Sequence, residues 1–103
     1  MRNRYEAMLL TTIQANKEVI RALAEQYGAR NIRLFGSVSR GEERLDSNVD
    51  FLVEFPRGYD LFGQRLPLIE KLSTLLHRRL EVVPEHELNH YIRDKVLSEA
   101  MDL

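Results

Sequence analysis

The chain has 103 residues with 44% apolar and 30% charged side chains, a composition typical of one small globular domain over 1–103. Its formal charge of −1 gives no overall field that attracts nucleic acid, so any anion site must be local. The absence of cysteine excludes a disulfide framework, a thiol nucleophile and a cysteine-ligated metal. No apolar run suits a membrane span or a signal peptide, and we therefore expect a cytoplasmic protein.

The first half of the chain predicts one helix followed by two strands. Apolar residues at helical spacing indicate an amphipathic helix over 11–27, which Gly28 can end. Residues 31–35, NIRLF, are typical of a short strand that stops at Gly36. Strict alternation over 48–55 predicts a second strand, with Val49, Phe51, Val53 and Phe55 on one face and Asn48, Asp50, Leu52 and Glu54 on the other. Asn48 and Asp50 therefore project together from the start of this strand.

The second half predicts a helix, a strand and a further helix. Asp60 is expected to cap a helix whose leucines continue to Leu76, and Pro67 predicts a kink or a break where a new helix begins. Residues 79–83 (RLEVV) are typical of a third strand, and residues 85–100 of an amphipathic helix. The final MDL can add an edge strand. This order favours a small mixed β-sheet flanked by helices, in the α+β class.

Gly36 and Ser37 form the first element of a candidate anion site. A strand that ends in Gly-Ser exposes successive backbone N–H groups, and glycine permits the close approach of an anion. Ser37 adds a hydroxyl, and Arg40 returns to the same side if the segment makes a helical turn. Together these residues can hold a phosphate. The alternative is an ordinary strand-ending turn with an exposed arginine.

Oxygen-bearing side chains supply the second element. Asn48 and Asp50, at i and i+2 on one face, can hold a hard cation such as Mg²⁺, and a solvated strand edge is the alternative. Glu81 lies among apolar residues in a strand that we expect to be central, where a carboxylate needs a partner. If that strand lies beside the second strand, Glu81 joins Asp50 at one metal centre. Otherwise Glu81 can pair with Arg79 or Arg33.

The combination of these elements resembles the nucleotidyltransferase superfamily, and more narrowly the minimal nucleotidyltransferases (MNT type) that are antitoxins of HEPN-domain toxins. Gly-Ser, ten intervening residues, a strand with acceptors at i and i+2 and an acid on a later strand carry the resemblance. It extends through RLFGSVSRGE, SNVDFLVEF, YDLF, RLEVVPE and YIRDKVLSEA. It implies a nucleotidyltransferase-like fold and transfer of AMP from ATP, with Mg²⁺ as cofactor, to a tyrosine of the partner toxin. It also implies a hetero-oligomer with that toxin, without direct contact to nucleic acid or membrane.

The resemblance assigns roles residue by residue. Gly36 and Ser37 match the phosphate-binding turn of the family, and Arg40 matches a basic position in it, so these three are expected to bind the nucleotide. Asp50 matches the second carboxylate of the family's Asp-x-Asp pair. Glu81 stands where a third acid, usually Asp, is found.

Asn48 is the departure from the family pattern, because it stands where the first Asp belongs. The expected metal ligands and catalytic residues are Asn48, Asp50 and Glu81, and the amide removes one negative charge from a site that holds two dications. Its NH₂ group cannot face a metal. We therefore expect weaker metal binding and slower transfer. The alternative is a catalytically impaired antitoxin that neutralises the toxin by forming a complex with it.

Residues 86–90, HELNH, match the zinc-protease pattern H-E-x-x-H on a predicted helix. His86 and His90 share one face of such a helix, with Glu87 as the candidate base. A catalytic zinc needs a third protein ligand, and Glu99 lies out of phase on the same helix. The sequence therefore favours two polar helix residues over a zinc site.

Overall fold

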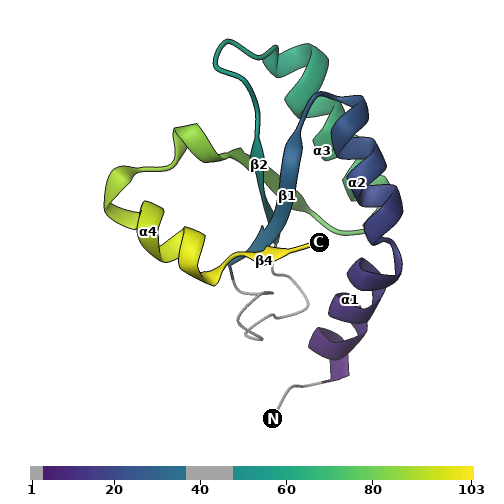
Figure 1. Cartoon of the computed structure of the whole chain (residues 1–103). Helices are drawn as coiled ribbons and strands as arrows, with labels where there is room; N and C mark the ends of the chain where they lie inside the picture. The colour runs from purple at the N-terminus through teal and green to yellow at the C-terminus, as the bar shows by residue number, and fades with distance from the viewer. Residues whose placement is uncertain (1–3, 37–47) are drawn as a thin grey trace.

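The structure is a computed structural model that describes residues 4–36 and 48–103, with side chains described from residue 9 onward in the first helix. Among these residues, no helix is long and apolar enough to cross a bilayer. The elements in chain order are α1 (Arg4–Ala15), α2 (Lys17–Gln26), β1 (Arg30–Phe35), β2 (Val49–Glu54), the π-helix η1 (Leu61–Arg65), α3 (Leu66–Leu76), β3 (Leu80–Pro84), the 3₁₀ turn η2 (Glu85–Glu87), α4 (His90–Glu99) and β4 (Met101–Asp102) (Figure 1).

The four strands form one mixed sheet in the order β3-β2-β1-β4. Strand β1 is antiparallel to both of its neighbours, whereas β2 and β3 are parallel and α3 makes the crossover between them. The predicted α+β class is therefore confirmed, and so is the edge strand from the last residues. The prediction that Glu81 lies in a central strand is wrong, because β3 is an edge strand of the sheet that the described residues form. Order along the chain does not determine lateral order in a sheet.

Leu9, Leu10 and Ile13 of α1 join a hydrophobic core that lies between the sheet and the helices α2 and α3. Figure 1 shows these two helices on one side of the sheet and α4 on the other. The predicted apolar face of β2 is confirmed, since Val49, Phe51, Val53 and Phe55 all belong to the core. Leu52, on the opposite face, is also fully buried. Leu52 pairs with Arg33 of β1 and with Val83 of β3. Its burial shows that the face of the sheet opposite the core is also shielded from solvent at this position.

The first helical region differs from the prediction of one helix over 11–27. It begins earlier, at Arg4, and is interrupted at Asn16, where α1 ends and α2 begins. The Asn16 amide Nδ2 donates a hydrogen bond to the carbonyl oxygen of Thr12 at 2.8 Å. Asparagine competes in this way for backbone groups, which explains the interruption within a continuous apolar pattern. Gly28 follows α2 with φ +82, as expected of a residue at a helix end.

The segment that leads into α3 agrees with the sequence predictions for Asp60 and Pro67. The Asp60 carboxylate accepts a hydrogen bond from the backbone N–H of Phe62 at 3.0 Å, which confirms the predicted cap. The π-helix η1 ends at Arg65, and α3 begins at Leu66 with Pro67 in its first turn. The predicted break at the proline is therefore confirmed. Proline fits the first turn of a helix because its missing N–H has no intrahelical partner there.

The predicted helix over 85–100 is wrong in its first turn. Residues 85–87 form the turn η2, and Leu88 and Asn89 are extended, with ψ values of 136° and 130°. Helix α4 begins only at His90, where the Asn89 side chain accepts a hydrogen bond from the N–H of Tyr91 at 2.8 Å. Asparagine is among the preferred N-caps, so this local signal starts a new helix inside the apolar pattern.

Candidate functional site

The candidate site is a row of side chains across three neighbouring strands. Phe35 of β1 pairs with Asp50 of β2, and Asp50 pairs with Glu81 of β3. Residues in register on neighbouring strands project from the same face of a sheet, so the carboxylates of Asp50 and Glu81 are cross-strand neighbours. Asp50 is partly buried and Glu81 is exposed. The structure therefore brings together the two acids that the sequence predicted would meet if their strands were adjacent.

Gly36 lies against the Asp50 carboxylate at the end of β1. Its φ is +78°, and a Cβ built on it would lie 2.5 Å from Oδ2 and 3.3 Å from Cγ of Asp50. The antiparallel pairing explains this contact, because β1 ends opposite the point where β2 begins. The predicted turn glycine and the predicted metal ligand are therefore direct neighbours.

Of the other predicted site residues, the structure describes Asn48 but not Ser37 or Arg40. Asn48 is exposed and immediately precedes β2, two residues before Asp50. Ser37 and Arg40 lie outside the described residues. The alternative partners of Glu81 do not engage it: Arg33 pairs with Glu85 instead, and within the described ranges no ion pair joins Glu81 to Arg79.

The donor set at this row fits one hard cation. Over residues 4–36 and 48–103, no group of three His, Cys, Asp or Glu side chains is placed to hold a metal. The row instead offers the two neighbouring carboxylates of Asp50 and Glu81, with the neutral amide of Asn48 two residues from Asp50. Carboxylate and amide oxygens, completed by water and phosphate oxygens, are the ligands that Mg²⁺ prefers. A second dication would lack one negative charge relative to three carboxylates.

The H-E-x-x-H segment does not form one helical face, so its predicted placement on a helix is wrong. His86 lies in η2 and His90 begins α4, with the extended Leu88 and Asn89 between them. The His86 ring lies edge-on to Tyr59, with ring centroids 6.1 Å apart. The two histidines therefore belong to different elements, and the i, i+4 geometry of a zinc site is not formed.

Tyr59, Arg65 and Glu87 form a network that the sequence did not reveal. The Tyr59 hydroxyl donates to Glu87 Oε2 at 2.6 Å, and Arg65 Nη1 donates to the Tyr59 oxygen at 3.1 Å and to Glu87 Oε1 at 3.3 Å. Arg65 Nε also donates to the Val82 carbonyl at 2.8 Å. Burial raises the pKa of Tyr59, and the hydrogen bond to Glu87 raises it further. This network attaches the start of α3 to β3 and η2.

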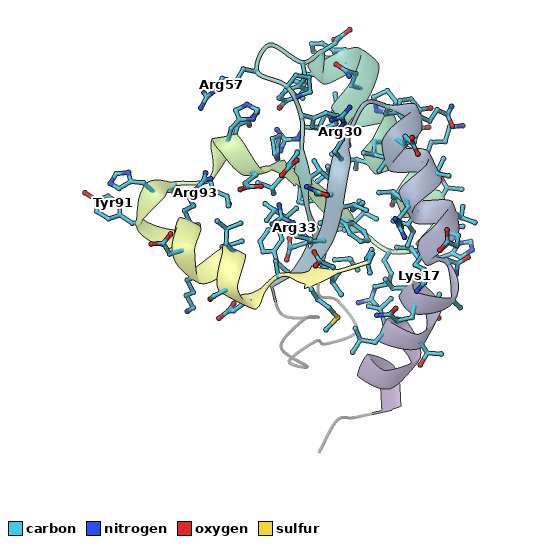
Figure 2. The ribbon with its side chains drawn as sticks, in the orientation of Figure 1. Lys17, Arg30, Arg33, Arg57, Tyr91 and Arg93 are labelled. Carbon is cyan, nitrogen blue, oxygen red and sulfur yellow. The ribbon has the colours of Figure 1, made fainter. Side chains whose placement is uncertain are left out.

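A second network attaches α4 to the sheet face that carries the site. Arg33 Nη2 donates to Glu85 Oε2 at 2.7 Å, and Arg93 Nη2 donates to Glu85 Oε1 at 3.2 Å. Figure 2 shows Arg33 on β1 and Arg93 on α4, on the side of the sheet where α4 lies. No residue of α4 is fully buried, although Val96 and Leu97 are half-buried, and Arg93 is the α4 side chain that joins this network. The sequence alone does not predict the pair of Arg33 and Glu85, because the two residues are far apart in the chain.

Known proteins are similar to this chain in sequence and in fold. The family described as nucleotidyltransferase domain matches residues 16–103. A relative from Thermococcus cleftensis, named protein adenylyltransferase MntA, is 35% identical over 98 residues, covering 91% of this chain and 98% of the relative.

Two solved structures show how far the fold is shared. One, named as a candidate minimal nucleotidyltransferase, has a TM-score of 0.81 and 40% identity, covering 91% of this chain and 95% of that one. A chain from the complex of a tri-AMPylated Shewanella oneidensis HEPN toxin with an MNT antitoxin has a TM-score of 0.65 at 22% identity, covering 86% of this chain and 69% of that one. The family match over most of the chain, together with the mixed sheet and its row of carboxylates, establishes that this chain belongs to the nucleotidyltransferase domain family.

Proposed function

We propose that this chain is an antitoxin-type protein adenylyltransferase, which transfers AMP from Mg-ATP to a tyrosine hydroxyl of a HEPN-domain toxin. Family membership supports a nucleotidyl transfer, and the name of the Thermococcus relative supports a protein as the acceptor. The complex of an AMPylated HEPN toxin with an MNT antitoxin, whose fold this chain shares, supports the class of partner. In this proposal the chain and the toxin form a hetero-oligomer.

The observation that carries the proposal is the adjacency of Asp50 and Glu81 across the parallel strands β2 and β3, with Gly36 against Asp50. Two carboxylates that are cross-strand neighbours on one face of a sheet can ligate one hard cation together. We assign Asp50, Glu81 and the amide oxygen of Asn48 as the metal ligands. The nucleotide phosphates are assigned to Gly36, with Ser37 and Arg40 following it in the sequence.

The proposed reaction is a substitution at the α-phosphorus of ATP. The phenolic oxygen of the acceptor forms a bond to this phosphorus, the bond to the β-phosphate oxygen breaks, and pyrophosphate leaves while the phenolic proton passes to solvent. Bound Mg²⁺ supplies charge neutralisation of the phosphates and lowers the pKa of the attacking hydroxyl. The contribution of Asp50 and Glu81 is to fix negative charge at one position on a rigid sheet, which orients the triphosphate for in-line attack.

Asn48 favours a second candidate function, a binding module that neutralises the toxin without modifying it. An amide at the first ligand position lowers the negative charge that holds the metal, and so lowers the transition-state stabilisation of transfer. Toxin binding through the protein surface does not depend on that charge. Both functions use the same partner, and they differ in whether AMP is transferred.

The two functions are distinguished by intact-mass measurement of the toxin. We expect a HEPN-domain protein from the neighbouring reading frame to gain one or more AMP units after incubation with this chain and saturating Mg-ATP. Asp50→Ala should abolish the gain, whereas Asp94→Ala, on the exposed surface of α4, should leave it unchanged.

An unmodified toxin under these conditions contradicts the adenylyltransferase. If the unmodified toxin nevertheless forms a complex with the parent chain and with Asp50→Ala, and its toxicity is suppressed by both, the binding module is the function. Size-exclusion chromatography of the mixtures provides the complex readout.

A further inference from the structure

Gly36 approaches Asp50 more closely than any side chain at position 36 allows. The Cβ of an alanine there would lie 2.5 Å from Oδ2 and 3.3 Å from Cγ of Asp50, and φ is +78°. We propose that Gly36 is a positioning residue for Asp50: its missing side chain leaves the space in which the Asp50 carboxylate takes its metal-binding orientation. This inference rests on the proposed role of Asp50 as a metal ligand.

The usual reason for glycine in such a turn is different. Glycine lets an anionic ligand approach the backbone, and it accepts a positive φ without strain. Neither reason involves Asp50. The structure adds a third reason, which predicts that a methyl group at 36 disturbs metal binding before any nucleotide is present.

The two other glycines of positive φ among the described residues show what distinguishes position 36. Gly58 has nearly the same φ, +83°, but a Cβ there would meet nothing within 4 Å. At Gly28 the contact would be with the end of the long Gln64 side chain, which hydrogen bonds to Tyr27 and Asp60 and is not a candidate ligand. Gly36 is therefore a glycine whose substitution combines the cost of a positive φ with displacement of a candidate ligand, and Gly58 is its matched control.

We expect a methyl group at position 36 to displace the Asp50 carboxylate rather than the backbone of β2. The backbone of Asp50 is held between Phe35 of β1 and Glu81 of β3, so β2 cannot retreat without disturbing both pairings. The Asp50 Cβ lies 3.5 Å from the built Cβ, an ordinary contact that needs no adjustment. Relief therefore comes from rotation of the short carboxylate away from its position or out of its preferred rotamer.

The first test measures Mn²⁺ affinity without nucleotide, by calorimetry or water-proton relaxation. We expect Gly36→Ala to weaken Mn²⁺ binding by about tenfold or more, as loss of orienting contacts around metal ligands does. Gly58→Ala should bind Mn²⁺ like the parent. Parent-like Mn²⁺ affinity in Gly36→Ala, combined with weakened ATP binding, would overturn the inference in favour of a role limited to phosphate approach.

The second test needs no metal and keeps the inference separate from the proposed function. In an Asp50→Ala background the carboxylate atoms that would collide with the new methyl group are gone, so Gly36→Ala should lower the urea unfolding midpoint by less than it does in the parent. Gly58→Ala should lower the midpoint equally in both backgrounds. Equal losses for Gly36→Ala in both backgrounds would overturn the inference. Failure of the parent to bind Mn²⁺ would contradict the proposed metal site, and the midpoint comparison would still decide whether Gly36 positions Asp50.

Discussion

Replacing Asn48 with aspartate should strengthen metal binding, because it adds a carboxylate two residues from Asp50. A unit charge about 4 Å from a dication contributes about 2 kcal/mol in bulk water and about 8 kcal/mol at an effective dielectric constant of about 20. Asn48 is exposed, so solvent screens the new charge, and the side chain must lose hydration to bind. The lower part of the range therefore applies, about 2–4 kcal/mol, which is about 30- to 1,000-fold in affinity.

Calorimetric titration with Mg²⁺ in the presence of a non-hydrolysable ATP analogue measures this gain. Thermal unfolding provides a second measurement, in which the change in unfolding temperature should have opposite signs without and with metal. Without metal, the added charge repels its neighbours Asp50 and Glu81, so Asn48→Asp should unfold at a lower temperature than the parent. With saturating Mg²⁺ the order should reverse, because tighter binding to the folded state stabilises it by mass action.

The matched control is Asn89→Asp, which adds the same charge at the N-cap of α4. Aspartate caps a helix about as well as asparagine, so the fold should be unaffected and the affinity for Mg²⁺ should stay at the parent value. If Asn48→Asp binds Mg²⁺ no more tightly than the parent, the assignment of position 48 as a metal ligand is refuted. A gain in affinity without a gain in AMP transfer would limit Asn48 to metal binding.

Two further predictions concern the networks around the site. Glu85→Ala leaves Arg33 and Arg93 without the carboxylate that lies 2.7 and 3.2 Å from them, and Arg33 is only 16% exposed, so urea unfolding should show a loss of about 2–3 kcal/mol. Glu18→Ala removes an exposed pair at 3.9 Å and should cost less than about 0.5 kcal/mol; equal losses would contradict the role of the network. Burial raises the pKa of Tyr59 above its ordinary value of 10.0, so its contribution to stability is complete below that pH and is lost as pH rises through the raised value. The urea midpoint should therefore fall more steeply above about pH 10 in the parent than in Tyr59→Phe, and parallel curves would show that Tyr59 is not responsible.

Local signals predicted much of the fold. The alternation of β2 was correct because it reflects which face of a strand meets the core, and the core includes Val49 and Phe51 as expected. Asp60 and Pro67 acted as predicted because capping and the missing N–H of proline operate within one turn of chain. The same kind of local signal operates at Asn89, whose capping side chain starts α4 within a continuous apolar pattern.

The pattern of residues along the chain is enough to predict the strands, the spacing between the turn and the acids, and the amide at position 48. These features depend on residues close together in the chain. Three features depend on the packed fold instead: β3 lies at an edge and parallel to β2, Arg33 pairs with Glu85 rather than Glu81, and Gly36 lies against Asp50. Lateral strand order and contacts between distant residues follow from how the whole sheet buries its apolar face, and no local pattern encodes that packing.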